Sequence, residues 1–294
     1  MLDLVIENTT INLLKLAVTE LPLDIKQGIK MALDQERNEV ARNQLNTIIK
    51  NFELASNTNI PMCQDTGTII FYLRVGEKFP ILSPLPQILK RATKRASEVI
   101  PLRPNAVNPF TNKNSGDNAG KYIPFINWEL VSGDTLKITA FPKGGGSENT
   151  STIRMLNPGL GIKGIKRFIV DTVISAGGKP CPPVILGIGI GGGADIAMKL
   201  AKKALLRPLS RHHDESEVAK LEEELLILTN MTGVGPMGLG GDTTVLGVNV
   251  EYAHRHPASL PVAIAFQCWA ARKASAKISS DGRVEYLTHK MKGD

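Results

Sequence analysis

Three cysteines, Cys63, Cys181 and Cys268, are the residues of this chain best suited to metal chemistry. They lie 118 and 87 residues apart, and no two of them form a C-x-x-C pair. An odd number of cysteines argues against a disulfide framework, and such wide spacing excludes a local zinc knuckle. The cysteines are therefore either unrelated thiols or residues that the fold brings to one point.

Each cysteine lies where an expected helix or strand ends, which is where loops gather and sites form. The local sequences are P-M-C-Q-D-T-G-T, G-G-K-P-C-P-P and Q-C-W. Pro180 and Pro182 flank Cys181, fix the backbone and remove amide donors. This suits a rigid metal ligand, and it equally suits a plain turn before a strand.

Three thiolates at one point would have a specific chemical meaning. A [4Fe–4S] cluster normally takes four cysteine ligands. With three, one iron lacks a thiolate and acts as a Lewis acid rather than as an electron relay. Such an iron can hold a hydroxyl group and an adjacent carboxylate.

Four motifs resemble the signatures of class I fumarases. They are P-M-C-Q-D-T-G-T at 61–68, K-G-G-G-S-E-N at 143–149, G-G-K-P-C-P-P at 177–183, and R-H-P at 255–257 followed by Q-C-W. They occur in the family's order and at similar spacing, and the resemblance extends from about residue 7 to residue 290. The related L-tartrate dehydratase alpha subunits share much of this pattern.

The resemblance implies that the three cysteines ligate a [4Fe–4S] cluster. It also implies a set of substrate-contacting residues: Gln64, Asp65, Arg103, a backbone amide at Gly145 or Gly146, and His256. Asp65 and His256 are the two with an implied catalytic part. Single-chain family members have a second domain that completes the site, so a separate beta subunit and a hetero-oligomer are expected.

The residue types agree with these roles. The planar fork of Arg103 suits a carboxylate, successive glycines let backbone amides approach an anion, and Asp65 is a candidate general acid. Each residue also has a plainer explanation. An Asp before Thr-Gly is often a turn residue, and a lone His is often structural. Arg74, Arg154 and Arg272 are unassigned and are compatible with surface ion pairs.

The implied activity is reversible hydration of fumarate to (S)-malate. An L(+)-tartrate dehydratase alpha subunit is the alternative with the same chemistry, although K-G-G-G-S-E-N looks more like the fumarase version. An iron–sulfur electron carrier and a protein with three structural thiols are alternatives from other classes. A further motif, G-x-G-x-x-G at 187–192, lacks the acidic residue that dinucleotide binding requires, because Arg207 stands at that distance.

The pattern of helices and strands expected to position these residues indicates an α/β fold. It would have a mixed sheet with flanking helices and a helical N-terminal lobe. We expect one catalytic domain over 1–294, with a helical lobe at about 1–57 and an α/β cluster-binding lobe at about 58–294. Helices are predicted at 85–100, 162–175, 194–206 and 215–229. Strands are predicted at 68–73, 136–141, 184–190, 245–250 and 262–266, with a long ordered loop at 101–127 and a hairpin turn at 280–283.

Composition excludes some classes of protein. Of 294 residues 42% are apolar, and the net charge is +7. The basic residues are scattered rather than clustered with aromatics, which argues against nucleic-acid binding. No apolar run approaches the roughly 20 residues that a membrane span requires, and no signal peptide is apparent. A cytoplasmic protein is expected, and its charge suits an anionic small substrate or an acidic partner.

Overall fold

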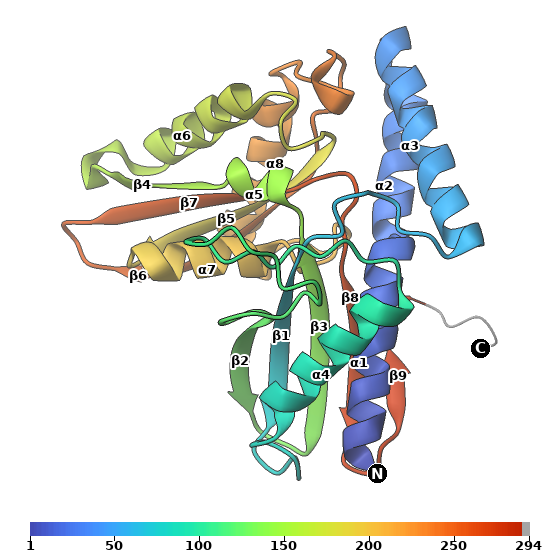
Figure 1. Cartoon of the computed structure of the whole chain (residues 1–294). Coiled ribbons are helices and arrows are strands. Elements are labelled where there is room, and N and C mark those ends of the chain that lie inside the picture. Colours follow the sequence, from blue (N-terminus) through green and yellow to red (C-terminus); the bar gives the residue numbers. More distant parts are fainter. Residues whose placement is uncertain (290–294) are drawn as a thin grey trace. The chain divides into compact units, whose positions relative to one another are not determined.

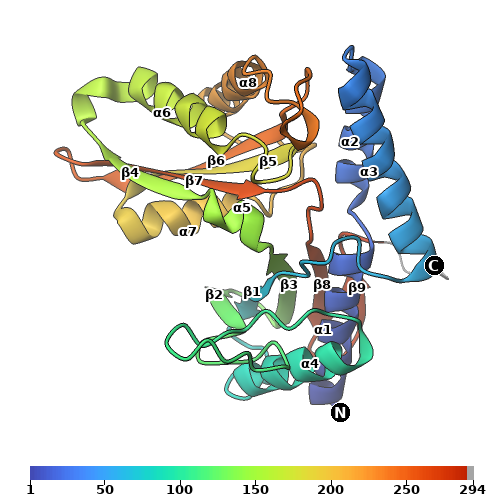
Figure 2. The ribbon, with the colours of Figure 1, turned by 45° about the horizontal axis from the view of Figure 1, so that its top comes forward.

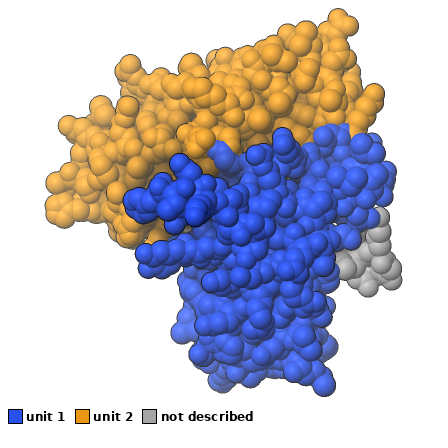
Figure 3. Space-filling view, in the orientation of Figure 1, with its two compact units in different colours: residues 1–23, 51–145, 272–294 blue, residues 24–50, 146–271 orange. Residues whose placement is uncertain are grey.

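The computed structural model describes residues 1–289. Its chain divides into two compact units (Figure 3). Unit 1 contains residues 1–23 and 51–145 and the segment from 272 onward, and unit 2 contains residues 24–50 and 146–271. The expected N-terminal helices are present as α1 (Leu2–Thr19), α2 (Leu23–Gln35) and α3 (Glu39–Thr58). They do not form a unit of their own, and the single catalytic domain stays a prediction.

Unit 1 is a five-stranded sheet with two helices on one face (Figure 1). Its strand order is β2-β1-β3-β8-β9, with β1 parallel to β2 and the other neighbours antiparallel. The bounds are β1 Thr68–Gly76, β2 Phe125–Val131, β3 Thr135–Lys143, β8 Ala274–Ser279 and β9 Val284–Tyr286. Alternate apolar residues of β1, β3 and β8 pack against α1 and α4 (Leu85–Val99), as the period of two along a strand requires.

Unit 2 is a four-stranded sheet with helices on both faces (Figure 2). Its strand order is β4-β7-β5-β6, and only the β5–β6 pair is parallel. The strands are β4 Thr152–Leu156, β5 Val184–Gly192, β6 Val245–Arg255 and β7 Leu260–Gln267. Helices α6 (Gly161–Ala176) and α8 (Ser216–Asn230) cover one face and α7 (Ala194–Ala204) the other, so every residue of β7 is buried.

The glycines of β5 account for the dinucleotide-like motif. A Cβ built on Gly187 or Gly189 would collide with the carbonyl oxygens of Ala201 or Ala197 in α7. The missing side chains therefore let α7 pack directly on the strand. This packing explains the glycine spacing without a nucleotide.

The α/β fold with mixed sheets and flanking helices is confirmed. The hairpin turn at 280–283 is also present, because Ser279 N donates to Arg283 O at 3.0 Å between β8 and β9. Four strands were not predicted, namely β2, β4, β8 and β9. Within residues 1–289, no helix combines the length and the apolar character needed to cross a bilayer.

Candidate active site

In unit 1, the first cysteine lies in a short connection between α3 and β1. Met62 N donates to Val18 O at 2.9 Å and ties this connection to the C-terminal end of α1. Cys63 is half-buried and Gln64 is exposed. The connection therefore presents both side chains next to Asp65.

Asp65 is held by backbone and side-chain donors on both carboxylate oxygens. Oδ1 accepts from Gly67 N at 2.9 Å and from Asn105 Nδ2 at 3.4 Å, and Oδ2 accepts from Gly145 N at 2.7 Å. The bond to Gly67 is the turn interaction expected of an Asp before Thr-Gly. The bond to Gly145 joins the same carboxylate to the glycine-rich loop, so Asp65 is more than a turn residue.

Arg103 is placed beside this segment by its main chain. The hydroxyl of the buried Thr66 accepts from Arg103 N at 3.0 Å and donates to Arg103 O at 3.2 Å. The Arg103 side chain is exposed. Further along the loop, Asn118 Oδ1 accepts from Asn105 N at 2.7 Å, which helps to order the loop as expected. Thr66 and Asn105 were not predicted as site residues, and no local signal marks either of them.

Arg272, for which a surface ion pair was considered, is buried in unit 1 and only 2% exposed. Its Nη1 donates to Asp65 O at 2.7 Å, and its Nε donates to Pro142 O at 3.3 Å. An ordinary surface ion pair is therefore excluded for Arg272. Of the other unassigned arginines, Arg74 does pair with Glu129 at 3.2 Å on the surface.

In unit 2, the fold brings Cys181 and Cys268 together. Cys268 directly follows β7 and Cys181 precedes β5, and these strands are antiparallel neighbours with Ile185 opposite Gln267. Trp269 N donates to Cys181 O at 3.2 Å. Two cysteines 87 residues apart in sequence thus lie beside neighbouring ends of the two central strands of one sheet.

The backbone at Cys181 has an unusual conformation. Its φ is 56°, in the left-handed region that a residue with a Cβ rarely adopts. Such a conformation persists only where the surroundings impose it, and it often marks a functional position. This conformation is compatible with a rigid ligand and equally with a plain turn, since Cys181 N donates to Gly178 O at 3.0 Å across a turn.

Gln267, the last residue of β7 and the neighbour of Cys268, has a buried polar side chain. It is 1% exposed, and the described residues offer no hydrogen-bond partner to its Oε1. A buried amide oxygen without a donor is costly and calls for an explanation. The atom belongs to the residue that directly precedes the Cys268 thiol.

A second glycine-rich loop, residues 233–241, packs against the segment that carries Cys181. Met237 N donates to Pro182 O at 2.8 Å, and a Cβ on Gly178 would lie 2.8 Å from Met237 O. This loop is anchored by the buried carboxylate of Glu36, which accepts from Asp242 N at 2.9 Å and from Thr243 N at 3.2 Å. The sequence did not indicate this support.

The anchor also involves the neighbouring charged pair. Arg37 Nη2 donates to Asp242 Oδ1 at 2.7 Å, and this bond holds the pKa of Asp242 at about 2. Asp242 therefore stays ionised over the physiological range. The connection between α2 and α3 is thereby fastened to the loop that supports Cys181.

His256 lies far from the two cysteines of its unit. It occupies the turn between β6 and β7, where Ala258 N donates to its Nδ1 at 3.1 Å. Cys268 follows the opposite end of β7, which has eight residues. At about 3.3 Å per residue, the strand separates the two positions by roughly 25 Å. Unit 2 therefore does not bring His256 to Cys181 and Cys268.

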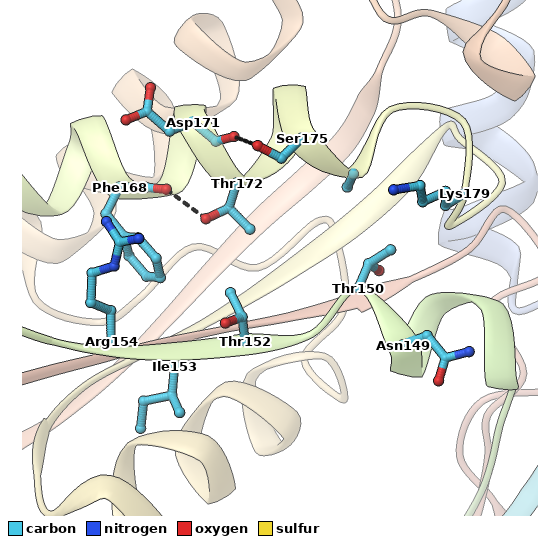
Figure 4. A pocket seen from close by; sticks show the side chains of 11 residues that line it. Asn149, Thr150, Thr152, Ile153, Arg154, Phe168, Asp171, Thr172, Ser175 and Lys179 are labelled. Carbon is cyan, nitrogen blue, oxygen red and sulfur yellow. Dashed lines mark hydrogen bonds between the residues drawn. The ribbon is translucent and has the colours of Figure 1, made fainter.

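A cavity of about 400 Å³ opens in unit 2 between β4 and α6 (Figure 4). Arg154 lies over the ring of Phe168, with its Cζ 5.3 Å from the ring centroid. The hydroxyls of Thr172 and Ser175 donate to carbonyl oxygens of their own helix. Arg154 thus has a cation–π partner, and we assign the cavity no ligand.

The predicted ligands belong to different units. Cys63 is in unit 1, whereas Cys181 and Cys268 are in unit 2. Among residues 1–289, the structure shows no group of three His, Cys, Asp or Glu side chains that could hold a metal ion. No disulfide joins these cysteines, so all three are thiols.

Comparison with known proteins identifies the family. The family described as Fumarate hydratase (Fumerase) matches residues 7–277. The chain belongs to the fumarate hydratase family. It is therefore a hydro-lyase, and the resemblance seen in the four motifs is confirmed.

Relatives of this fumarate hydratase family member extend over nearly its whole length. A Methanocaldococcus jannaschii protein named "Putative L(+)-tartrate dehydratase subunit alpha" is 46% identical over 95% of this chain and 99% of its own. The L(+)-tartrate dehydratase subunit alpha of Escherichia coli K12 is 35% identical over 92% of this chain and 90% of its own. That of Escherichia coli UTI89 is 36% identical over the same shares.

Proposed function

We propose that this chain is the cluster-bearing alpha subunit of a class I fumarase, which interconverts fumarate and (S)-malate. The observation that carries the proposal is the adjacency of Cys181 and Cys268 in a chain of the fumarate hydratase family. A third thiol, Cys63, lies in the connection that also carries Gln64 and Asp65. Thiols and substrate-binding groups are thus carried by the same short segments.

The donor set fits a [4Fe–4S] cluster. Cys63, Cys181 and Cys268 would hold it, and no fourth cysteine is available. The rigid left-handed backbone at Cys181 and the unpartnered buried oxygen of Gln267 are both consistent with a bound group beside the thiols. When bound, such a cluster supplies a Lewis-acidic iron that has no thiolate ligand.

The chain's own residues would bind the substrate and handle its protons. Arg103 is exposed, and its guanidinium can form a bidentate pair with one carboxylate of a dicarboxylate. The Asp65 side chain is fixed in direction by its hydrogen bonds, and in its protonated carboxylic-acid form it would deliver a proton to the departing hydroxyl. Gln64 is exposed beside Asp65 and would contact the substrate.

Two backbone amides of the glycine-rich loop would have different roles. Gly145 N already donates to Asp65, so it orients the carboxylate. Gly146 is exposed and is the better candidate for direct contact with an anion. His256 keeps its proposed place near the substrate only if a second copy of the chain supplies it, because its own sheet holds it far from Cys268.

A separate beta subunit is part of the proposal. The relatives quoted above are named as alpha subunits, and this chain covers 90% or more of each. A beta subunit would supply the remaining groups that bind the substrate's carboxylates and the catalytic base. The active form would then be a hetero-oligomer.

The second candidate is L(+)-tartrate dehydration, which the names of the relatives favour. Malate and L(+)-tartrate, the hydroxylated substrates of the two reactions, differ by one hydroxyl group. Anaerobic co-purification with a beta subunit, followed by turnover of fumarate, malate and L(+)-tartrate, separates the two candidates. We expect kcat/KM for malate to exceed that for L(+)-tartrate by about 10²-fold, the smaller end of what one hydroxyl group contributes to discrimination. Faster tartrate turnover would establish the second candidate, and no turnover of either would contradict both.

Arg103→Lys should reduce kcat/KM by roughly 30-fold or more. Lysine keeps the charge but loses the planar fork, and a lost contact to a buried charge typically costs about 2–5 kcal/mol. Steady-state kinetics with fumarate measures the change, while iron content should stay as in the unsubstituted protein. Arg74→Lys is the matched control, since Arg74 pairs with Glu129 on the surface of the same unit. Near-normal kinetics in Arg103→Lys would make Arg103 a structural residue.

A further inference from the structure

Arg272 is a buried cation without an obvious structural purpose. It lies just before β8, is 2% exposed, and has the buried Lys273 as its neighbour. Burying a guanidinium costs free energy unless its donors are satisfied by good acceptors. The location of those acceptors therefore indicates what the residue is for.

The acceptors of Arg272 belong to the two segments that define the candidate site in unit 1. Nη1 donates to Asp65 O at 2.7 Å, and Nε donates to Pro142 O at 3.3 Å, directly before Lys143 and the glycine-rich loop. The guanidinium thus bridges the segment that carries Cys63, Gln64 and Asp65 to the segment that carries Gly145. Each segment is held by its main chain, so the bridge fixes backbone position.

Gly144 shows how closely the guanidinium approaches the Asp65 carboxylate. A Cβ built on Gly144 would collide with Nη2 of Arg272 and would lie 3.1 Å from Oδ2 of Asp65. Both charged groups therefore border the space that the missing side chain leaves open. A side chain at this position would have to displace the guanidinium of Arg272.

We propose that Arg272 is a positioning residue of the active site, which orients Asp65 for proton transfer and holds its carboxylate against the Gly145 amide. This inference rests on the proposed function of Asp65. Arg272 donates to the main chain of Asp65, so its effect on the reaction would pass through Asp65. Its rigid fork spans two carbonyl groups at once, which the single point charge of a lysine does not do.

The first test measures the Asp65–Gly145 hydrogen bond directly. In the full-length chain, Arg272→Lys should speed hydrogen exchange of the Gly145 amide by about tenfold, the order expected for losing one hydrogen bond. Exchange in α7, in the other unit, should not change. This readout does not depend on which substrate the enzyme uses, so it stands even if the proposed function fails.

The second test measures turnover in the complex with the beta subunit. Arg272→Lys should lower kcat by about 10²-fold, as a small misplacement of a reacting group does, with KM nearly unchanged. Cluster iron content should stay normal. If the unsubstituted complex turns over neither fumarate nor tartrate, the proposed function fails; if it is active and Arg272→Lys is equally active, the inference about Arg272 fails.

Gly144→Ala tests the same contact from the opposite side. Its Cβ would press on the guanidinium, so it should reproduce both the faster exchange and the lower kcat. Gly120→Ala is the matched control, because nothing lies within 4 Å of a Cβ built there in the same unit. Normal exchange and normal kcat in folded Gly144→Ala would overturn the proposal. Loss of the fold in both Arg272→Lys and Gly144→Ala would make Arg272 structural and would overturn it too.

Discussion

Cys63→Ser, Cys181→Ser and Cys268→Ser should each abolish turnover together with the visible absorption of an iron–sulfur cluster. The chain has only these three cysteines, so no spare thiol can replace a lost ligand. Serine is close to isosteric but is a harder ligand that does not replace thiolate in such clusters. Activity, iron and sulfide should be measured on each variant purified anaerobically with the beta subunit.

The structure supplies a control for local disruption. Met62 is 4% exposed and directly precedes Cys63, so Met62→Leu changes the packing beside the first ligand while conserving volume. This variant should keep its cluster and most of its activity. Unchanged iron content in any of the three serine variants would remove that cysteine from the ligand set.

The chain purified without any beta subunit should show negligible hydratase activity. Its relatives are named as alpha subunits, and the described residues supply one exposed arginine, Arg103, to the candidate site for a substrate with two carboxylates. Without a covering subunit, water would also reach the site freely and weaken each electrostatic contact to the substrate. Fumarate hydration by the anaerobic, iron-replete chain is the measurement.

Co-expression with the beta subunit is the matching experiment. It should restore turnover and yield a hetero-oligomer, which size-exclusion chromatography with light scattering can detect. Cys63→Ser within the complex, which should have no turnover, serves as the control for any contaminating hydratase. The two-subunit proposal would be wrong if the isolated chain, shown free of partners, hydrated fumarate at an ordinary enzymatic rate of about 1 s⁻¹ or faster.

Local patterns were sufficient for most helices and central strands. The helix predicted at 85–100 is α4 (Leu85–Val99), and the strand predicted at 184–190 is the first part of β5. These segments carry strong apolar periodicity or buried runs, which depend on neighbouring residues alone. The unpredicted β2 and β4 are edge strands. Their residues are partly exposed and pair on one side only, so their strand structure depends on partners distant in the chain.

The sequence by itself determined the family, the three thiols and the order of the site motifs, because each is a short run of residue types. It also indicated Asp65, Arg103 and the glycine-rich loop, which unit 1 brings together through Thr66 and the Gly145 amide. Only the tertiary structure decided that Cys181 lies beside Cys268, that His256 is held at the other end of β7, and that Arg272 is buried against Asp65. The physical reason is that the pairing of distant strands decides which of their ends lie side by side. The burial of a side chain at such an end then depends on the residues that the neighbouring strand brings there. Neither the strand pairing nor the burial can be read from the residues adjacent in sequence to these positions.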